Sequence, residues 1–228
     1  HINAGYNWSP SRLLLSPTFH GRDSFAISLL YQALSAQLFV RFGEKMEEKG
    51  SLPLTIFSNR QGKTRQVINM NDIVTALALS TEIRSAVIID KKILYFESMS
   101  IQDVSRRLSS AHIWVSPHGA NMANMIFLRK NAAVIEILPY RCQRLRVFFQ
   151  SMASALGLRY YSTSPTRAME LQGFEDPSSI DDLAATRRLC DFEQCINTEK
   201  WEYMNFRIEE GLVSQKILQA VYTTETFE

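Results

Sequence analysis

The sequence predicts an α/β protein in which a parallel β-sheet carries helices on both faces. Short apolar runs and helical patterns alternate from residue 53 to about residue 162. The apolar runs are nearly continuous, a pattern typical of strands that are covered on both faces. Alternation of such strands with helices favours a Rossmann-like arrangement, in which ligands bind beyond the carboxyl ends of the strands.

Hydrophobic periodicity and end signals place the individual elements. Apolar residues from Ile27 to Met46 recur at steps of three and four, which predicts a long helix that ends at Gly50. Ser100-Ile-Gln-Asp103 resembles a capping box, and Asn121 is expected to cap a helix that begins at Met122. The predicted strands are 53–57, 86–90, 111–116, 132–138 and 158–162, with 93–96 as a further strand or an extended continuation. Four other helices are predicted. The first is 71–82, capped by Asn71 or Asp72, and the second begins at Ser100. The third is 144–156, closed by Gly157, and the last is 205–222.

Composition narrows the class of protein. The chain has 228 residues, of which 46% are hydrophobic and 21% charged, as in an ordinary globular protein. A net charge of +2 argues against a general attraction to nucleic acid. No apolar run is long enough to cross a bilayer, and no signal-peptide pattern is present. Since the chain begins at His1 rather than Met, we expect a fragment, with any membrane anchor or export signal upstream of it.

The three cysteines do not form a disulfide framework. Cys190 and Cys195 are close enough in sequence to bridge a local loop, and two free thiols explain them equally well. Cys142 is expected to be a buried thiol. The cysteines therefore leave the redox compartment open.

Two loops that follow predicted strands carry the residues expected to bind an anion. The first, Ser58–Asn69, contains Arg60, Lys63 and Arg65, and guanidinium groups make paired hydrogen bonds to phosphate. A solvated basic loop is the alternative, and we retain it for Lys63. The second loop, Ser116–Asn121, opens a predicted helix whose first N–H groups suit a phosphate or diphosphate. Both loops should lie at the same edge of the sheet.

Two further residues have more than one interpretation. Glu136 lies inside an apolar strand, where it either accepts hydrogen bonds from ribose hydroxyls or pairs with an arginine such as Arg141. His118 is either a general base, a donor to phosphate or an organiser of its own loop, and we favour the phosphate donor.

Metal binding is not favoured by the sequence. His112 and His118 lack a third ligand at suitable spacing. Asp181-Asp182 is similar to acidic pairs that hold a divalent metal in other enzymes, but a helix N-terminus explains it as well.

The same residues carry a family resemblance. His118-Gly119-Ala120, followed by Asn124, Phe127, Glu136 and Pro139, resembles the signature of glycosyltransferase family 61. Arg60 and Arg65-Gln-Val-Ile-Asn69 are similar to a second block of that family. The resemblance runs from about Leu52 to about Ser162. It implies a GT-B fold. The candidate nucleotide-sugar-binding residues are Arg60, Arg65, Asn69, His118, Gly119, Ala120, Asn121 and Glu136. For Asn69 the resemblance leaves open whether it contacts the nucleotide or fixes the loop.

The resemblance also implies a function. We expect an inverting hexosyl- or pentosyltransferase that moves a sugar from a nucleotide diphosphate, such as a UDP-sugar, to a hydroxyl of a glycan or glycoprotein. The alternative is a noncatalytic nucleotide-sugar-binding fragment or pseudoenzyme. The catalytic base is unknown, with His118 as a candidate, and no cofactor is expected, although a divalent metal is not excluded. The expected compartment is the lumen of the Golgi or endoplasmic reticulum.

In this interpretation the chain divides into three parts. Residues 1–50 are a remnant of the acceptor-side domain with its long helix. Residues 51–200 form the Rossmann-like nucleotide-sugar domain, and residues 201–228 form a C-terminal helix that packs back on the domains.

Overall fold

A five-stranded parallel sheet forms the centre of the molecule. The computed structural model describes residues 33–34, 51–61, 65–140, 142–166, 171–172 and 205–223, with the side chains of residues 144, 171 and 172 left out. The strands are β1 (Leu54–Phe57), β2 (Ile88–Ile89), β3 (Ile113–Pro117), β4 (Ala133–Ile137) and β5 (Arg159–Thr163). They lie in the order β2-β1-β3-β4-β5, and every neighbouring pair is parallel. The predicted parallel sheet is confirmed.

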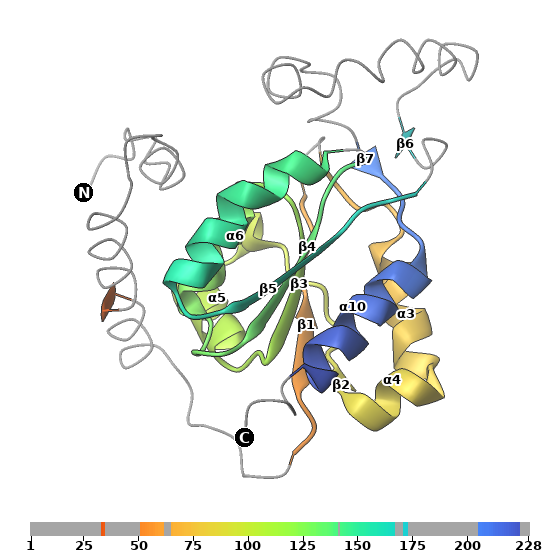
Figure 1. The fold of residues 1–228 in the computed structure, drawn as a ribbon, viewed down its shortest axis with the longest axis horizontal. Coiled ribbons are helices and arrows are strands. Elements are labelled where there is room, and N and C mark those ends of the chain that lie inside the picture. The colour runs from red at the N-terminus through yellow and green to blue at the C-terminus, as the bar shows by residue number, and fades with distance from the viewer. Residues whose placement is uncertain are drawn as a thin grey trace.

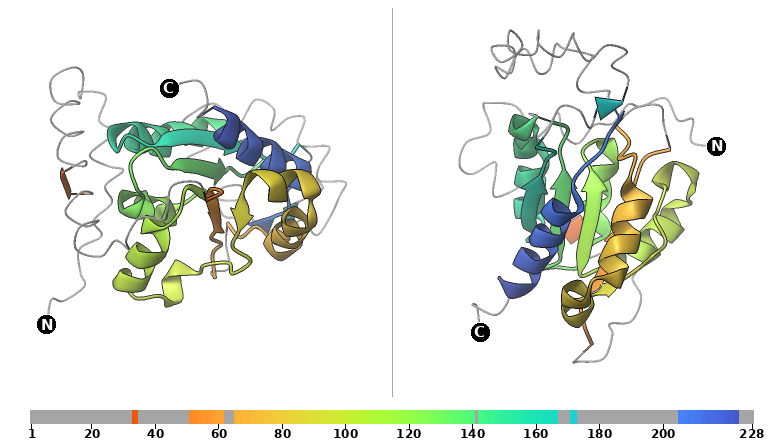
Figure 2. Two further views of the ribbon diagram at one scale, coloured as in Figure 1. Left: turned by 90° about the horizontal axis from the view of Figure 1, so that it is seen from below. Right: turned by 90° about the vertical axis from the view of Figure 1, so that its right-hand side faces the viewer.

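Helices cover both faces of this sheet (Figures 1 and 2). One face packs against α3 (Met70–Leu79), α4 (Thr81–Ala86) and α10 (Glu210–Tyr222). The other packs against α5 (Ile101–Ser109), the 3₁₀-helix η2 (Ala120–Phe127) and α6 (Arg146–Ala155). Within β3, Ile113 and Val115 enter the first core, whereas Trp114 enters the second. Because successive side chains of a strand point to opposite faces and both faces are covered, most positions of β3 and β4 are apolar, and Ser116 and Glu136 are the polar exceptions.

Several local signals act as predicted. The Ser100 hydroxyl accepts a hydrogen bond of 3.1 Å from the N–H of Asp103 and caps α5. Gly157 has φ +69° directly after the last turn of α6, a conformation that glycine adopts without strain. Cys142 is buried, as predicted.

Other element boundaries differ from the prediction. The predicted helix 71–82 is two helices, because Ser80 is extended and caps α4 by accepting a hydrogen bond from the N–H of Ile83. Since α4 continues to Ala86, the strand predicted from that residue is reduced to β2. Of residues 93–96, Leu94 forms an isolated bridge with Ser58, and the 3₁₀-helix η1 (Phe96–Ser98) follows.

The predicted final helix, 205–222, begins too early. Residues Asn205–Phe206 form strand β7, which pairs with β6 (Leu171–Gln172). Phe206 also exchanges backbone hydrogen bonds with Gln66 and Ile68. This pairing joins distant segments, so helical periodicity did not reveal it.

The helix predicted after Asn121 is also wrong in type and start. η2 begins at Ala120, its cap position is Gly119, and no side chain caps it. The Asn121 amide instead donates to the Glu97 carboxylate at 3.0 Å. A tertiary partner thus replaces the local capping bond that the sequence predicted.

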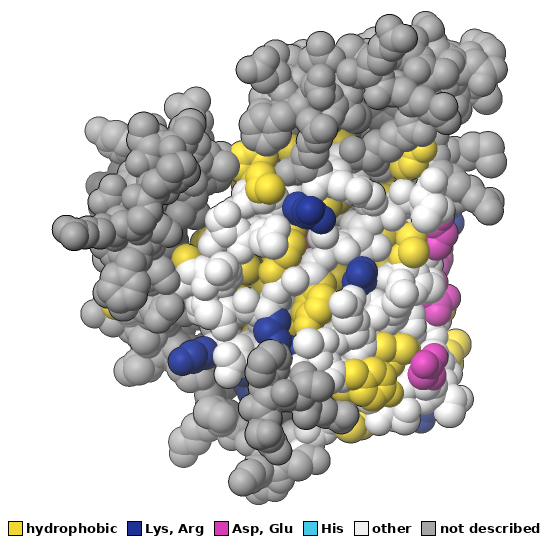
Figure 3. Space-filling model, in the orientation of Figure 1, with side chains coloured by type: hydrophobic (Ala, Val, Ile, Leu, Met, Phe, Trp, Pro, Cys, Tyr) yellow, Lys and Arg dark blue, Asp and Glu magenta, His cyan; other side chains and the backbone are white. Residues whose placement is uncertain are grey.

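Among the described residues visible in Figure 3, the Lys and Arg side chains are spaced singly. No helix among the described residues is long and apolar enough to span a membrane. Apart from residues 33 and 34, the predicted acceptor-side remnant (1–50) lies outside the described residues, as do Lys63, Arg141, Asp181, Asp182, Cys190 and Cys195.

Candidate functional site

The strand order reverses at β1, which has β2 on one side and β3 on the other. Connections leave β1 and β3 toward opposite faces of the sheet, and a crevice forms beyond the carboxyl ends of strands at such a switch point. The two predicted anion-binding loops leave these two strands. Ser58, at the start of the first loop, donates its N–H to the carbonyl of Val115 at 2.9 Å. The structure therefore brings both loops to one edge, as predicted.

The loop after β1 is closed by Asn59. Its buried amide donates to the Val67 carbonyl at 2.8 Å and accepts from the Val67 N–H at 3.1 Å. This double hydrogen bond fixes both ends of the segment that carries Arg60 and Arg65. Arg65 has φ +61°, an uncommon conformation for a residue with a side chain. Such backbone strain gathers at functional sites, where the surrounding structure maintains it.

Both arginines reach the loop after β3 at Gly119. A Cβ atom placed on Gly119 would lie 2.6 Å from Nη1 of Arg60 and 3.7 Å from Nη1 of Arg65. Burial lowers the pKa of the Arg60 guanidinium, the charge of Arg65 lowers it further, and Glu97 opposes the shift. The Arg60 Nε is buried without a partner among the described residues. Two neighbouring cations at the start of a helix form a strongly anion-attracting environment.

His118, directly before Gly119, belongs to a buried polar network. Its Nδ1 lies 2.5 Å from Oε1 of Glu136, which is fully buried in β4. The Tyr160 hydroxyl on β5 donates to Oε2 of Glu136. Burial raises the pKa of Tyr160, and the charge and hydrogen bond of Glu136 raise it further. The Phe149 ring packs edge-on against His118 with centroids 5.4 Å apart.

This network bears on the two interpretations of Glu136. The carboxylate has a protein partner at each oxygen and no exposed surface, so these contacts favour a role in orienting His118 over direct contact with ribose. Arg141 lies outside the described residues, and the partners seen are an imidazole and a phenol.

Of the remaining predicted site residues, two lie at the carboxyl edge of the sheet, and one joins α3 to the segment before α10. Ala120 is exposed at the edge, and Asn121 lies beside it, held by Glu97. Asn69 donates to the Ile208 carbonyl at 2.8 Å and accepts from the Ile208 N–H at 3.1 Å. Its amide therefore ties α3 to the segment before α10, and its predicted contact with a nucleotide stays a prediction.

Sequence reasoning missed Asn59 and Tyr160. A polar residue directly after an apolar strand is a weak signal for Asn59, because many loops begin in that way. Tyr160 stands in a run of partly exposed strand residues with no distinguishing pattern. Its partner could be found only from the strand pairing.

Among the described residues, no group of three or more His, Cys, Asp or Glu side chains could hold a metal ion. The predicted metal alternative, Asp181-Asp182, lies outside them. Metal independence therefore stays a prediction.

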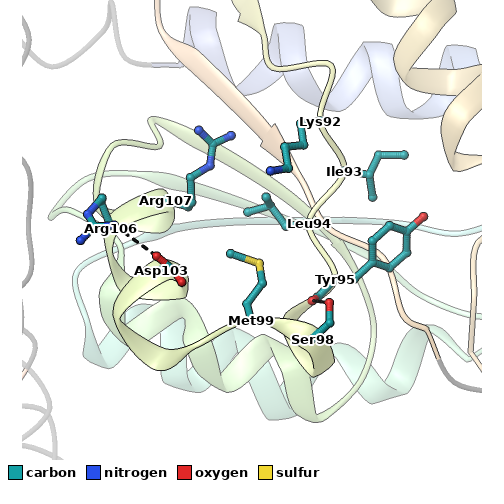
Figure 4. Close-up of a pocket in the computed structure, with 9 residues that line it drawn as sticks. All are labelled: Lys92, Ile93, Leu94, Tyr95, Ser98, Met99, Asp103, Arg106 and Arg107. Atoms are coloured by element: carbon teal, nitrogen blue, oxygen red, sulfur yellow. Dashed lines mark hydrogen bonds and ion pairs between the residues drawn. The ribbon is translucent and has the colours of Figure 1, made fainter.

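A cavity of ≈ 370 Å³ lies beside the site, between the segment after β2, η1 and α5. Leu94 and Met99 face one another across it in Figure 4. Arg106 and Arg107 line its rim and form ion pairs with Asp103 and Asp90. None of the eight predicted site residues lines this cavity.

The model of the family described as Glycosyltransferase 61 matches residues 11–135, more than half of the chain. The chain belongs to glycosyltransferase family 61. The match includes Arg60, Arg65 and the His118-Gly119-Ala120 loop, and it begins well before Leu52, where the sequence resemblance was expected to start.

Named relatives of this family 61 chain are similar over part of their length. Alpha-1,3-arabinosyltransferase XAT2 of Oryza sativa subsp. japonica is 30% identical over 47% of the chain and 18% of the rice protein. EGF domain-specific O-linked N-acetylglucosamine transferase of Rattus norvegicus is 30% identical over 58% of the chain and 24% of the rat protein. Protein O-linked-mannose beta-1,4-N-acetylglucosaminyltransferase 2 of Homo sapiens is 30% identical over 38% of the chain and 14% of the human protein. The matches thus span less than a quarter of each relative's length.

Proposed function

We propose that this chain is the nucleotide-sugar-binding part of a glycosyltransferase that moves a sugar from a UDP-sugar to a hydroxyl of a glycan or glycoprotein. The observation that carries the proposal is the convergence of Arg60 and Arg65 on Gly119 at the switch point of a parallel sheet. Membership of family 61 and the names of the relatives supply the reaction class.

In this proposal the two arginines carry the charge of the donor diphosphate. Guanidinium groups match phosphate oxygens in pairs and remain charged at any working pH. When the sugar leaves, negative charge builds on the departing diphosphate, so the same groups stabilise the transition state. N–H groups at the start of η2, beside Ala120 and Asn121, add to this effect.

The proposed displacement inverts the anomeric carbon. The acceptor hydroxyl then attacks from the side opposite the diphosphate, and its base belongs across the cleft, on the other half of a GT-B arrangement. His118 lies on the diphosphate side, next to Gly119, so we assign it to binding. A base at His118 is the competing assignment, and the two differ in their effect on UDP affinity and turnover.

Two further properties form part of the proposal. The arginines supply positive charge that a divalent metal provides in other glycosyltransferases, so we propose metal-independent catalysis. By family resemblance we propose that the whole protein works in the lumen of the Golgi or endoplasmic reticulum.

The test is titration of the folded protein with UDP by calorimetry. Removing either arginine costs a charge-assisted hydrogen bond worth about 1.5–3 kcal/mol, so Arg60→Ala and Arg65→Ala should each weaken UDP binding by about ten- to a hundredfold. Arg84→Ala is the matched control, because Arg84 is an exposed arginine near the end of α4, which leads to the amino end of β2.

Three outcomes decide between the readings. Weakened binding in the two site variants with parental affinity in Arg84→Ala supports the site. Equal binding in all three variants, or no binding of UDP by the parent, refutes it. Binding without transfer from any UDP-sugar by the full-length protein would favour the alternative, a noncatalytic nucleotide-sugar-binding protein.

A further inference from the structure

The network of His118, Glu136 and Tyr160 spans three neighbouring strands with the carboxylate in the middle. Ser116 of β3 pairs with Glu136 of β4, so His118, two residues after Ser116, lies diagonally beside the carboxylate. Val134 of β4 pairs with Tyr160 of β5, which places the phenol diagonally on the other side. Residues two apart on a strand share a face, so all three side chains meet on the face covered by α6.

The direction of each hydrogen bond in this network depends on which of the three side chains carries a proton. Tyr160 keeps its proton, because burial raises its pKa, and therefore donates to Oε2 of Glu136. With Glu136 as a carboxylate, which has no proton to give, the contact at Oε1 requires the proton on Nδ1 of His118. In the neutral ring, Nε2 then carries no proton and can only accept a hydrogen bond. Donation from Nε2 to a phosphate oxygen requires the doubly protonated ring, in which Nδ1–H still faces Glu136.

The other ring nitrogen is the one open to a ligand. His118 Nε2 has no hydrogen-bond partner among the described residues. It is also not one of the fully buried atoms that lack a partner there, so it is not sealed inside the protein. The edge-on Phe149 ring holds the imidazole from the α6 side. Gly119 follows His118 directly, so the ring stands next to the point where the arginines converge.

We propose that Tyr160 is a positioning residue that acts on His118 through Glu136. Donation from Tyr160 turns Glu136 so that Oε1 accepts from Nδ1, and this fixes the His118 tautomer and presents Nε2 at the sheet edge. The identity of the ligand as a nucleotide diphosphate rests on the proposed function, whereas the tautomer does not. The nearby charged groups are Arg146, which faces Tyr160, and Arg60 and Arg65, which face Gly119.

The tautomer can be read without any ligand. Two-bond ¹H–¹⁵N correlation spectra of ¹⁵N-histidine protein distinguish the two ring forms, and loss of a signal in His118→Asn assigns it among the four histidines. The parent should carry the proton on Nδ1. In Glu136→Gln, the single amide oxygen should accept from Tyr160 and leave the amide NH₂ facing Nδ1. The proton should therefore move to Nε2.

A double variant isolates the part played by Tyr160. In Glu136→Gln with Tyr160→Phe, the amide can turn its oxygen to His118, so the Nδ1–H form should return. Tyr161→Phe is the matched control, because Tyr161 is the next residue of β5 and packs on the opposite face of the sheet. It should keep the parental tautomer.

Three results would overturn the inference. They are a parent protonated at Nε2, a Glu136→Gln variant that keeps the parental form, and a double variant that keeps the form of Glu136→Gln. The first two do not require the tyrosine variant to fold, so the inference can fail even if Tyr160→Phe is unstable.

A second measurement connects the network to the ligand. Loss of one hydrogen bond that orients His118 should weaken UDP binding in Tyr160→Phe by about two- to tenfold, with no change in Tyr161→Phe. Parental affinity in a folded Tyr160→Phe variant would refute the positioning role. No UDP binding by the parent would refute the proposed function, and the tautomer spectra would still decide whether Tyr160 positions His118.

Discussion

Gly119 is the position where one added methyl group tests the site most directly. Its backbone has φ +146° and ψ −176°, a region that glycine alone occupies readily. Gly119→Ala should therefore lower the free energy of unfolding by about 1–3 kcal/mol through backbone strain. The new Cβ would also lie 2.6 Å from Nη1 of Arg60, which must move. Moving the end of a flexible side chain costs little stability, but it removes a cation from the edge of the sheet.

The consequence should be a loss of UDP affinity larger than strain alone explains. Displacing Arg60 forfeits a charge-assisted hydrogen bond worth about 1.5–3 kcal/mol, so Kd should rise about ten- to a hundredfold. If Gly119→Ala acts through Arg60, adding it to Arg60→Ala should cost little further affinity. Such non-additivity is the sign that two residues share one interaction.

Gly157→Ala provides the matched control. Gly157 has φ +69°, so alanine there is strained by about 1–2 kcal/mol. The nearest atom to its added Cβ is Lys130 Cγ at 3.8 Å, and the position precedes β5, at the end of the strands away from the site. Urea denaturation should show both variants destabilised, whereas calorimetry should show weak UDP binding in Gly119→Ala alone. If a folded Gly119→Ala variant binds UDP as tightly as Gly157→Ala does, the arginine site has been placed wrongly.

Four further predictions follow from the same geometry. Arg65→Lys should recover only part of the affinity lost in Arg65→Ala, because an ammonium lacks the paired donors of guanidinium; full recovery in the UDP titration would argue for simple charge attraction. Transferase activity of the full-length protein should survive EDTA, and loss of activity that manganese restores would revive Asp181-Asp182 as a metal site. His118→Ala should weaken UDP binding and raise KM for the UDP-sugar, whereas parental affinity with a collapsed single-turnover rate would make His118 the base. The pKa of Tyr160 is raised in the folded state. The stability that the Tyr160 hydroxyl contributes is therefore complete below its unfolded-state pKa of about 10 and declines at higher pH. Between about pH 9 and 11, urea titrations should show a smaller loss of stability in Tyr160→Phe than in the parent.

Much of the fold could be predicted from the sequence, because the signals for it are local. Strands covered on both faces are mostly apolar, so β3 and β4 are visible as nearly continuous apolar runs. Capping by Ser100 depends on a residue three positions away, and the end of α6 depends on Gly157. Parallel strands share a carboxyl edge, so the two binding loops could be assigned to that edge before any strand order was known.

The partners within the site were decided by tertiary structure. Glu136 meets His118 and Tyr160 only because of the register of β3, β4 and β5, and periodicity within one strand says nothing about register between strands. For Asn69 two roles were left open, contact with the nucleotide or fixing of the loop, and its amide binds Ile208, 139 residues away. Asn121 was predicted to cap a helix, yet its amide binds Glu97. A polar side chain pairs with whichever donor or acceptor the folded chain places nearest, and that neighbour is set by packing of distant segments rather than by the local sequence.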